Sequence, residues 1–109
     1  MFGNYKLKKT LSRVLRSEEE EVARRAADHL DLPYVNLNII PIDPEAVLTL
    51  TKEDALRGQL AIIEKAGRKI KIAAKNPAFV ITKRILDRLE EKGFISRIFI
   101  VSLSSLKKA

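Results

Sequence analysis

The sequence predicts a single α/β (α+β) domain, in which a small sheet of about four strands, including one hairpin, is packed by two main helices and several short ones. Three patterns indicate this fold: β-branched runs at 34–39 and 97–101, two strand-like runs joined by a glycine turn across 59–75, and helical periodicity at 18–30 and 79–92. The chain has 109 residues, of which 46% are hydrophobic, so one core is expected. The connection from the hairpin through helix 79–92 should be right-handed if its strands are parallel.

Residues 34–39 form the first predicted strand. Pro33 and Pro41 bracket this stretch, since proline cannot supply the N–H that a strand interior needs. Asp43 and Pro44 then have the form of a helix start, because an aspartate side chain can cap free N–H groups and proline fits the first helical position. The sequence therefore predicts a strand that leads directly into a short helix.

The remaining helices are predicted from caps and periodicity. Ser17 and Glu20 form a capping box at the start of helix 18–30, and the acidic run 18–21 lies at the positive end of the helix dipole. Thr51 opens a second short helix that Gly58 should end, and Gly93 should close helix 79–92. The predicted core consists of Val35, Leu37, Ile62, Ile70, Ile72, Ile85, Leu89, Ile98 and Ile100.

The hairpin and the last strand differ in their patterns. Gly67 supplies the turn of the hairpin, and its second strand alternates lysine with isoleucine, so one face should be solvated and basic. Residues 98–101 are apolar on both faces, which predicts a central or covered strand. Ser102 or Ser104 should then cap a terminal helix that contains Leu106.

The net charge is +7, which favours anionic partners. Two basic blocks carry it: Lys6, Lys8, Lys9, Arg13 and Arg16 form the first, and Lys65, Arg68, Lys69, Lys71 and Lys75 form the second. The first block lies on an amphipathic helix expected at 5–16, so residues 1–17 are interpreted as a basic helix or arm that precedes the domain at 18–109. The alternative is that this block is only a solvated helix face.

Four stretches carry a resemblance to a known family. They are Leu32-Pro33-Tyr34-Val35-Asn36-Leu37, Ile42-Asp43-Pro44-Glu45-Ala46, Ile72-Ala73-Ala74-Lys75-Asn76-Pro77 and Ile100-Val101-Ser102-Leu103-Ser104. In order and spacing, from about residue 22 to 106, the chain resembles the N-terminal domain of type II secretion and type IV pilus assembly ATPases. The resemblance implies a cytoplasmic protein-transport domain at the inner face of the membrane, expected to be a fragment of a longer protein that also holds the ATPase core.

The chain departs from that family at several points. Asn76 stands where the family usually has aspartate, and Lys52 opens the second short helix without the usual proline. Some relatives bind cyclic di-GMP through an Arg-Leu-Gly start and paired leucine and glycine repeats. Gly3 is the only glycine before Gly58, so those repeats are missing and cyclic di-GMP is not expected to bind.

No catalytic, cofactor or metal residue is predicted. The hairpin turn 66–69 has one glycine and no following helix, so it lacks the form of a P-loop. One histidine, His29, and no cysteine argue against a zinc site. The serines near the C-terminus have no neighbouring base, so they are interpreted as caps. The chain itself is therefore expected not to be an enzyme. A membrane-spanning helix is not expected either, because no apolar run approaches the ~20 residues of a membrane span.

Two functional classes remain. The first is a docking or adaptor domain that joins the ATPase to the cytoplasmic domain of a membrane-embedded secretion or pilus component, with peripheral contact to anionic membrane as an addition. Its candidate partner-binding residues are Arg68, Lys69 and Lys71 of the hairpin, with Lys6, Lys9 and Arg13 of the N-terminal segment. The alternative is a small basic nucleic-acid-binding domain. Aromatic residues are only 6% of the chain, so specific nucleic-acid binding is not expected, and any binding should be weak and sensitive to salt.

Overall fold

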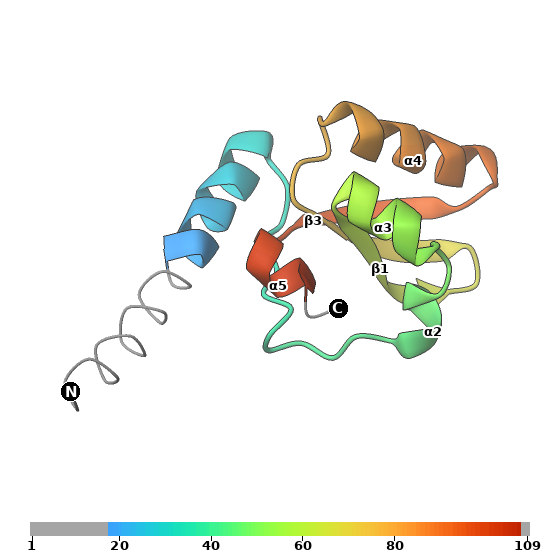
Figure 1. The fold of residues 1–109 in the computed structure, drawn as a ribbon, viewed down its shortest axis with the longest axis horizontal. Helices are drawn as coiled ribbons and strands as arrows, with labels where there is room; N and C mark the ends of the chain where they lie inside the picture. Colours follow the sequence, from blue (N-terminus) through green and yellow to red (C-terminus); the bar gives the residue numbers. More distant parts are fainter. Residues whose placement is uncertain (1–17, 108–109) are drawn as a thin grey trace.

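A computed structural model describes residues 18–107 (Figure 1). After a helix that covers residues 18–30, the elements are α2 (Pro44–Val47), α3 (Lys52–Gly58), β1 (Leu60–Ala66), β2 (Lys69–Ala74), α4 (Val80–Glu91), β3 (Ile95–Ile100) and α5 (Leu103–Lys107). A mixed fold with a hairpin and two main helices confirms the predicted class. The expected helix 5–16 lies outside the described residues. No helix among the described residues has the length and apolar character that a bilayer crossing requires.

The sheet has three strands in the order β1-β2-β3. β1 and β2 form the predicted antiparallel hairpin, with Gly67 in the left-handed conformation at φ 63°. β3 runs parallel to β2, and α4 makes the crossover between them. The hairpin ladder is interrupted by a one-residue bulge between Ile62 and Glu64.

The two faces of the sheet are covered differently. Helices α3 and α4 lie on one side of it (Figure 1), where Ile85 and Leu89 of α4 pack on Ile62, Ile70 and Ile72. The other face is covered only near the end at which β2 and β3 finish. There the segment 35–42 and α5 pack on a second cluster. The second cluster comprises Leu37, Ala61, Ile63, Ala73 and Val101.

The prediction of a strand at 34–39 was wrong. Tyr34 makes a single parallel bridge with Ile100, and the chain then turns away from the sheet. The cause is local, because the side chain of Asn36 accepts a hydrogen bond from the N–H of Asn38 at 2.9 Å and its carbonyl accepts from the N–H of Ile39 at 3.2 Å. Ile39 is 79% exposed, although a strand at 34–39 would place it on the same face as the buried Leu37.

Because residues 34–39 do not form a strand, the position of β3 in the sheet differs from the predicted one. Predicted to be central or covered, β3 is an edge strand among the described residues. Its last residue is fully buried, whereas Ile98 and Phe99 are half-buried. These apolar residues are accounted for by α4, which packs on one face of β3, and by the covered end of the opposite face. Apolar residues on both faces of β3 therefore did not require a neighbouring strand along both of its edges. Seven of the nine predicted core residues are buried, and Val35 and Ile98 are the half-buried ones.

The predicted helix caps within the described residues are confirmed with one difference, while Ser17 of the predicted capping box lies outside those residues. Asp43 accepts from the N–H of Glu45 at 3.0 Å, Thr51 from that of Asp54 at 3.1 Å, and Ser102 from that of Ser105 at 3.1 Å. Gly93 follows α4 with φ 92°. Gly58, however, is the last helical residue of α3, and Gln59 takes the left-handed conformation.

The need for glycine at 58 comes from packing. A Cβ atom there would lie 2.3 Å from Cδ2 of Leu60 and 2.6 Å from Cδ1 of Ile85, both in the core. The carbonyl of Gly58 accepts a hydrogen bond from the hydroxyl of Thr82 at 2.5 Å, and both residues are buried. This bond, together with an ion pair of 2.9 Å between Arg88 and Asp54, holds α3 against α4.

We predict that Thr82→Val lowers the free energy of unfolding by about 1–3 kcal/mol, because valine leaves the buried carbonyl of Gly58 without a donor. Urea unfolding of the two proteins measures the difference. Val80→Thr, an exposed change in the same helix, is the matched control and should stay within about 0.5 kcal/mol of the parent. Equal stability of T82V and the parent would contradict this role for the hydroxyl.

Candidate functional site

A row of cations crosses the open part of the sheet face opposite α4. Lys69 and Lys71 of β2 project there, because Ile70 and Ile72, which alternate with them, face the core. The parallel register pairs Lys71 with Arg97 of β3, so the arginine lies on the same face. Lys69, Lys71 and Arg97 are all exposed, and we call these three residues the cation row.

Glu64 moderates the charge of the cation row. Its carboxylate lies 2.6 Å from Nζ of Lys71, and both side chains are about half exposed, so the pair contributes roughly 0–1 kcal/mol of stability. The bulge in β1 is what brings Glu64 to this face, opposite Lys71. Lys69 and Arg97 thus remain as two cations without a counter-ion among the described salt bridges.

Two aromatic rings, Phe99 on this face and Phe94 on the side of α4, are already in contact with cations. The guanidinium of Arg97 lies over the ring of Phe99 at 5.4 Å from its centroid, and the ammonium of Lys65 lies 5.5 Å from that of Phe94. The half-buried Phe99 shares the face of the cation row. Its ring is therefore not freely available for stacking against another planar group.

The structure brings together only part of the predicted partner-binding set. Lys69 and Lys71 lie side by side on the open face, as expected. Arg68 lies in the turn, where its carbonyl accepts from the N–H of Ile95 at 2.7 Å and its guanidinium approaches Gly93. The other three candidates, Lys6, Lys9 and Arg13, lie outside the described residues.

Arg97 was missed by the sequence reasoning. It is a single cation in an otherwise mostly apolar strand, and this pattern could have indicated a functional residue. Its neighbours could not be deduced, because they depend on β2 and β3 being parallel and in this register. Sequence spacing alone does not place residue 97 beside residue 71.

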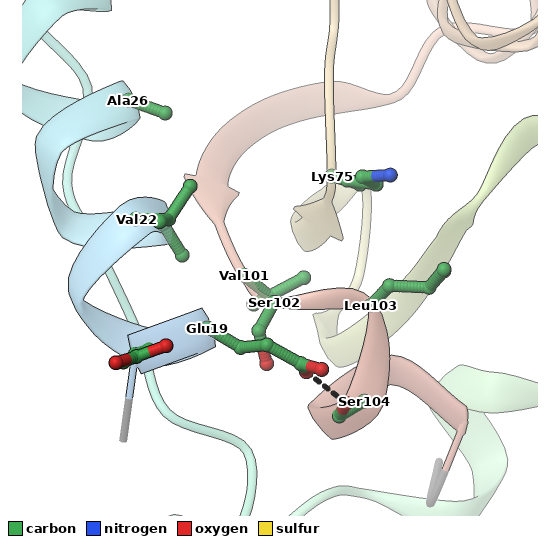
Figure 2. Close-up of a pocket in the computed structure, with 10 residues that line it drawn as sticks. Glu19, Val22, Ala26, Lys75, Val101, Ser102, Leu103 and Ser104 are labelled. Atoms are coloured by element: carbon green, nitrogen blue, oxygen red, sulfur yellow. Dashed lines mark hydrogen bonds between the residues drawn. The ribbon is translucent and has the colours of Figure 1, made fainter. Parts of the chain in front are cut away.

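A second candidate is an apolar groove between helix 18–30 and the segment that joins β3 to α5 (Figure 2). Its volume is about 550 Å³. Its walls carry Val22, Ala23, Ala26, Val101 and Leu103, with Glu18, Glu19, Lys75, Ser102 and Ser104 among them. Figure 2 shows the side chain of Glu19 reaching across one end to Ser104, while Lys75 lies on the other side. The groove can hold an aliphatic group, yet it offers no convergent set of polar groups for chemistry.

Glu20 ties helix 18–30 to the rest of the domain. One of its carboxylate oxygens accepts from the hydroxyl of Tyr34 at 2.5 Å, and the other accepts from the hydroxyl of Ser102. Burial, followed by the hydrogen bond to Glu20, raises the pKa of Tyr34 to about 12. The acidic start of this helix therefore makes tertiary contacts, in addition to its favourable place near the helix dipole.

The described chain contains no group of three or more histidine, cysteine, aspartate or glutamate residues placed to hold a metal ion. His29 is exposed on helix 18–30. The surfaces described above are suited to binding.

The comparison with solved structures found a similar fold. The structure described as MshE with cdg matches with a TM-score of 0.71 and 24% sequence identity, over 80% of this chain and 62% of that one. The chain thus spans less than two thirds of that structure. No protein-family model and no curated protein sequence matches the chain. The chain shares its fold with MshE over most of its length.

We predict that Tyr34→Phe costs about 0.5–2 kcal/mol of stability near pH 8, and that this difference from the parent shrinks as the pH rises from 10 to about 12. The pKa of Tyr34 is raised in the fold, so the protonated phenol stabilises the protein below pH 10, and that stabilisation is lost as the pH approaches the folded value. Urea unfolding at a series of pH values measures the difference.

Every other ionisable group is the same in both proteins, so its contribution cancels in the difference. Ser104→Ala removes a contact to Glu19 without removing a phenol, so its difference from the parent should not change with pH in this window. A constant Y34F difference up to pH 12 would show that the Tyr34–Glu20 bond does not carry the effect.

Proposed function

We propose that this chain is the non-catalytic N-terminal docking domain of a type II secretion or type IV pilus assembly ATPase. In this role it couples the motor to the cytoplasmic side of the membrane-embedded machine. The observation that carries the proposal is the fold shared with MshE over 80% of the chain, together with the four sequence stretches that resemble the family. The activity of the whole protein would belong to a nucleotide-hydrolysing core outside this chain.

The four stretches occupy positions that organise the fold. Tyr34 bridges to Ile100, Asp43 caps α2, the side chain of Asn76 accepts from the N–H of Ala78 at 3.0 Å before α4, and Ser102 caps α5. These side chains are engaged in holding the architecture, so we assign recognition of the partner to other residues.

The cation row is the surface we assign to that recognition. It combines two cations free of described salt bridges with the Lys71–Glu64 pair, on a face that the rest of the domain leaves open. Complementary charge accelerates association and fixes orientation, so an acidic surface on the cytoplasmic domain of a membrane component is the fitting partner. Anionic lipid headgroups beside that component would add attraction of the same sign.

A nucleic-acid-binding role has one observation in its favour. The sheet face carries the cation row and Phe99 together, which is the combination that single-strand binders use. The ring, however, is half-buried and covered by Arg97. Docking to protein remains the function we propose.

We expect the purified chain to show neither ATP hydrolysis nor a thermal shift with ATP, because the sequence has no P-loop. We also expect no shift with cyclic di-GMP, since the glycine-containing repeats that bind it in some relatives are missing. Differential scanning fluorimetry and a phosphate-release assay test both points. Hydrolysis that follows the protein through further purification, or a saturable shift with either nucleotide, would contradict the expectation.

We predict that the double variant Lys69→Glu, Arg97→Glu weakens association with the cytoplasmic domain of the secretion or pilus component by about tenfold or more at physiological salt. The matched control is Lys83→Glu, Arg84→Glu, which changes the net charge equally on exposed positions of α4. Binding between the purified chain and the purified cytoplasmic domain from the same organism can be measured by biolayer interferometry. Equal losses in both variants would indicate net charge alone, and no association of the parent chain would refute the docking function.

A further inference from the structure

The outer edge of β3 presents backbone groups with no partner strand in residues 18–107. In a parallel pair, alternate residues direct their N–H and C=O toward the neighbouring strand. The N–H of Ile95 donates to Arg68, so Ile95, Arg97 and Phe99 face β2. Ser96 and Ile98 therefore direct both of their backbone polar groups outward.

The next outward residue, Ile100, shows that this edge accepts a strand. Its N–H donates to the carbonyl of Pro33 at 2.8 Å, and its carbonyl accepts from the N–H of Val35 at 3.0 Å. The chain then turns away at Asn36, so this pairing ends after one bridge. What remains open is about 13 Å of edge, from Ile95 to Phe99.

The side chains along this edge define what would pair with it. On one face lies Arg97, with Lys71 and Lys69 behind it on β2. On the other face Ile98 packs against the core under α4 while staying half exposed. A strand added here would thus place alternate residues beside a cationic surface and beside an apolar one.

We propose that the outer edge of β3 binds an extended segment of a partner protein as a fourth strand, with a carboxylate side chain beside Arg97 and an apolar side chain beside Ile98. The partner segment accordingly alternates acidic and apolar residues. This inference rests on the proposed function, because it describes how the docking surface engages the cytoplasmic component. Addition of a strand to an exposed sheet edge is an established mode of peptide recognition.

A second copy of this chain is a poorer occupant. Pairing of two β3 edges would bring Arg97 of one copy close to the cationic face of the other. Like charges at such short separation oppose the pairing. Charge therefore selects an acidic segment.

The decisive variant is Ser96→Pro. The N–H of Ser96 points away from β2, so proline removes only an outward donor and places its ring on the edge, which is the position in a sheet that tolerates proline. Ser96→Ala keeps the donor and is the matched control. The probe is the end-blocked, fluorescein-labelled peptide Glu-Val-Glu-Val-Glu-Val, with Lys-Val-Lys-Val-Lys-Val as the comparison peptide.

We expect the acidic peptide to bind the full chain in about 50 mM salt, and the lysine peptide not to bind. S96A should bind within about twofold of the parent, whereas S96P should bind at least about tenfold more weakly. In the parent, amide hydrogen exchange at Ser96 and Ile98 should slow on addition of the acidic peptide. If S96P does not fold, the K69E/R97E variant, which keeps every backbone donor, should show the same loss of affinity.

With the peptide, the inference would be overturned by no binding of the acidic peptide, by unchanged affinity of S96P, or by slowed exchange confined to other segments. A dimer of the parent chain that S96P abolishes, detected by sedimentation, would assign the edge to a second copy and would also overturn it. If the cytoplasmic component binds S96P and the parent equally, the edge is refuted while the docking function stands. If no component binds but the peptide does, the docking function is refuted and the edge stands.

Discussion

Three backbone hydrogen bonds meet where β3 ends: Ile100 donates to Pro33 and accepts from Val35, and the N–H of Val101 donates to Ala74. The side chain of Ile100 is fully buried against Ala23 and Ala27, whose small size lets helix 18–30 approach closely. One residue therefore connects the sheet, the segment after helix 18–30 and that helix. The Glu20 contacts with Tyr34 and Ser102 surround the same point, so α5 is fixed there as well.

Features whose cause is local could be predicted from the sequence. The caps at Asp43 and Thr51, the glycine turn of the hairpin and the periodicity of α4 need only neighbouring residues, and the structure contains all of them. The prediction of a strand at 34–39 was wrong because a strand also depends on distant residues. The β-branched residues of this segment indicate a strand, but a strand needs a partner over its whole length. The side chain of Asn36 accepts from the N–H of Asn38 before a second bridge can form.

The candidate site shows the same division between local and distant causes. Lys69 and Lys71 could be placed on one face by alternation within a single strand. Arg97 could not, because its neighbours follow from a parallel register set by the length of α4 and its connections. Nor could the role of Gly58 be foreseen, since the atoms that exclude a side chain belong to Leu60 and Ile85 in other elements. The sequence shows which residues are charged or small, but the tertiary packing determines which residues each of them contacts.

The bulge in β1 has a consequence for how this surface changes during evolution. Before the bulge, Ile62 faces α4, and strict alternation would turn Glu64 to the same side and Lys65 to the open face. The extra residue reverses this, so Glu64 neutralises Lys71 and Lys65 contacts Phe94 instead. Regular pairing of the same residues, without the bulge, would exchange an anion for a cation beside Lys69 and Arg97. The electrostatic character of this face is therefore inherited through the pairing register of β1 as much as through its composition.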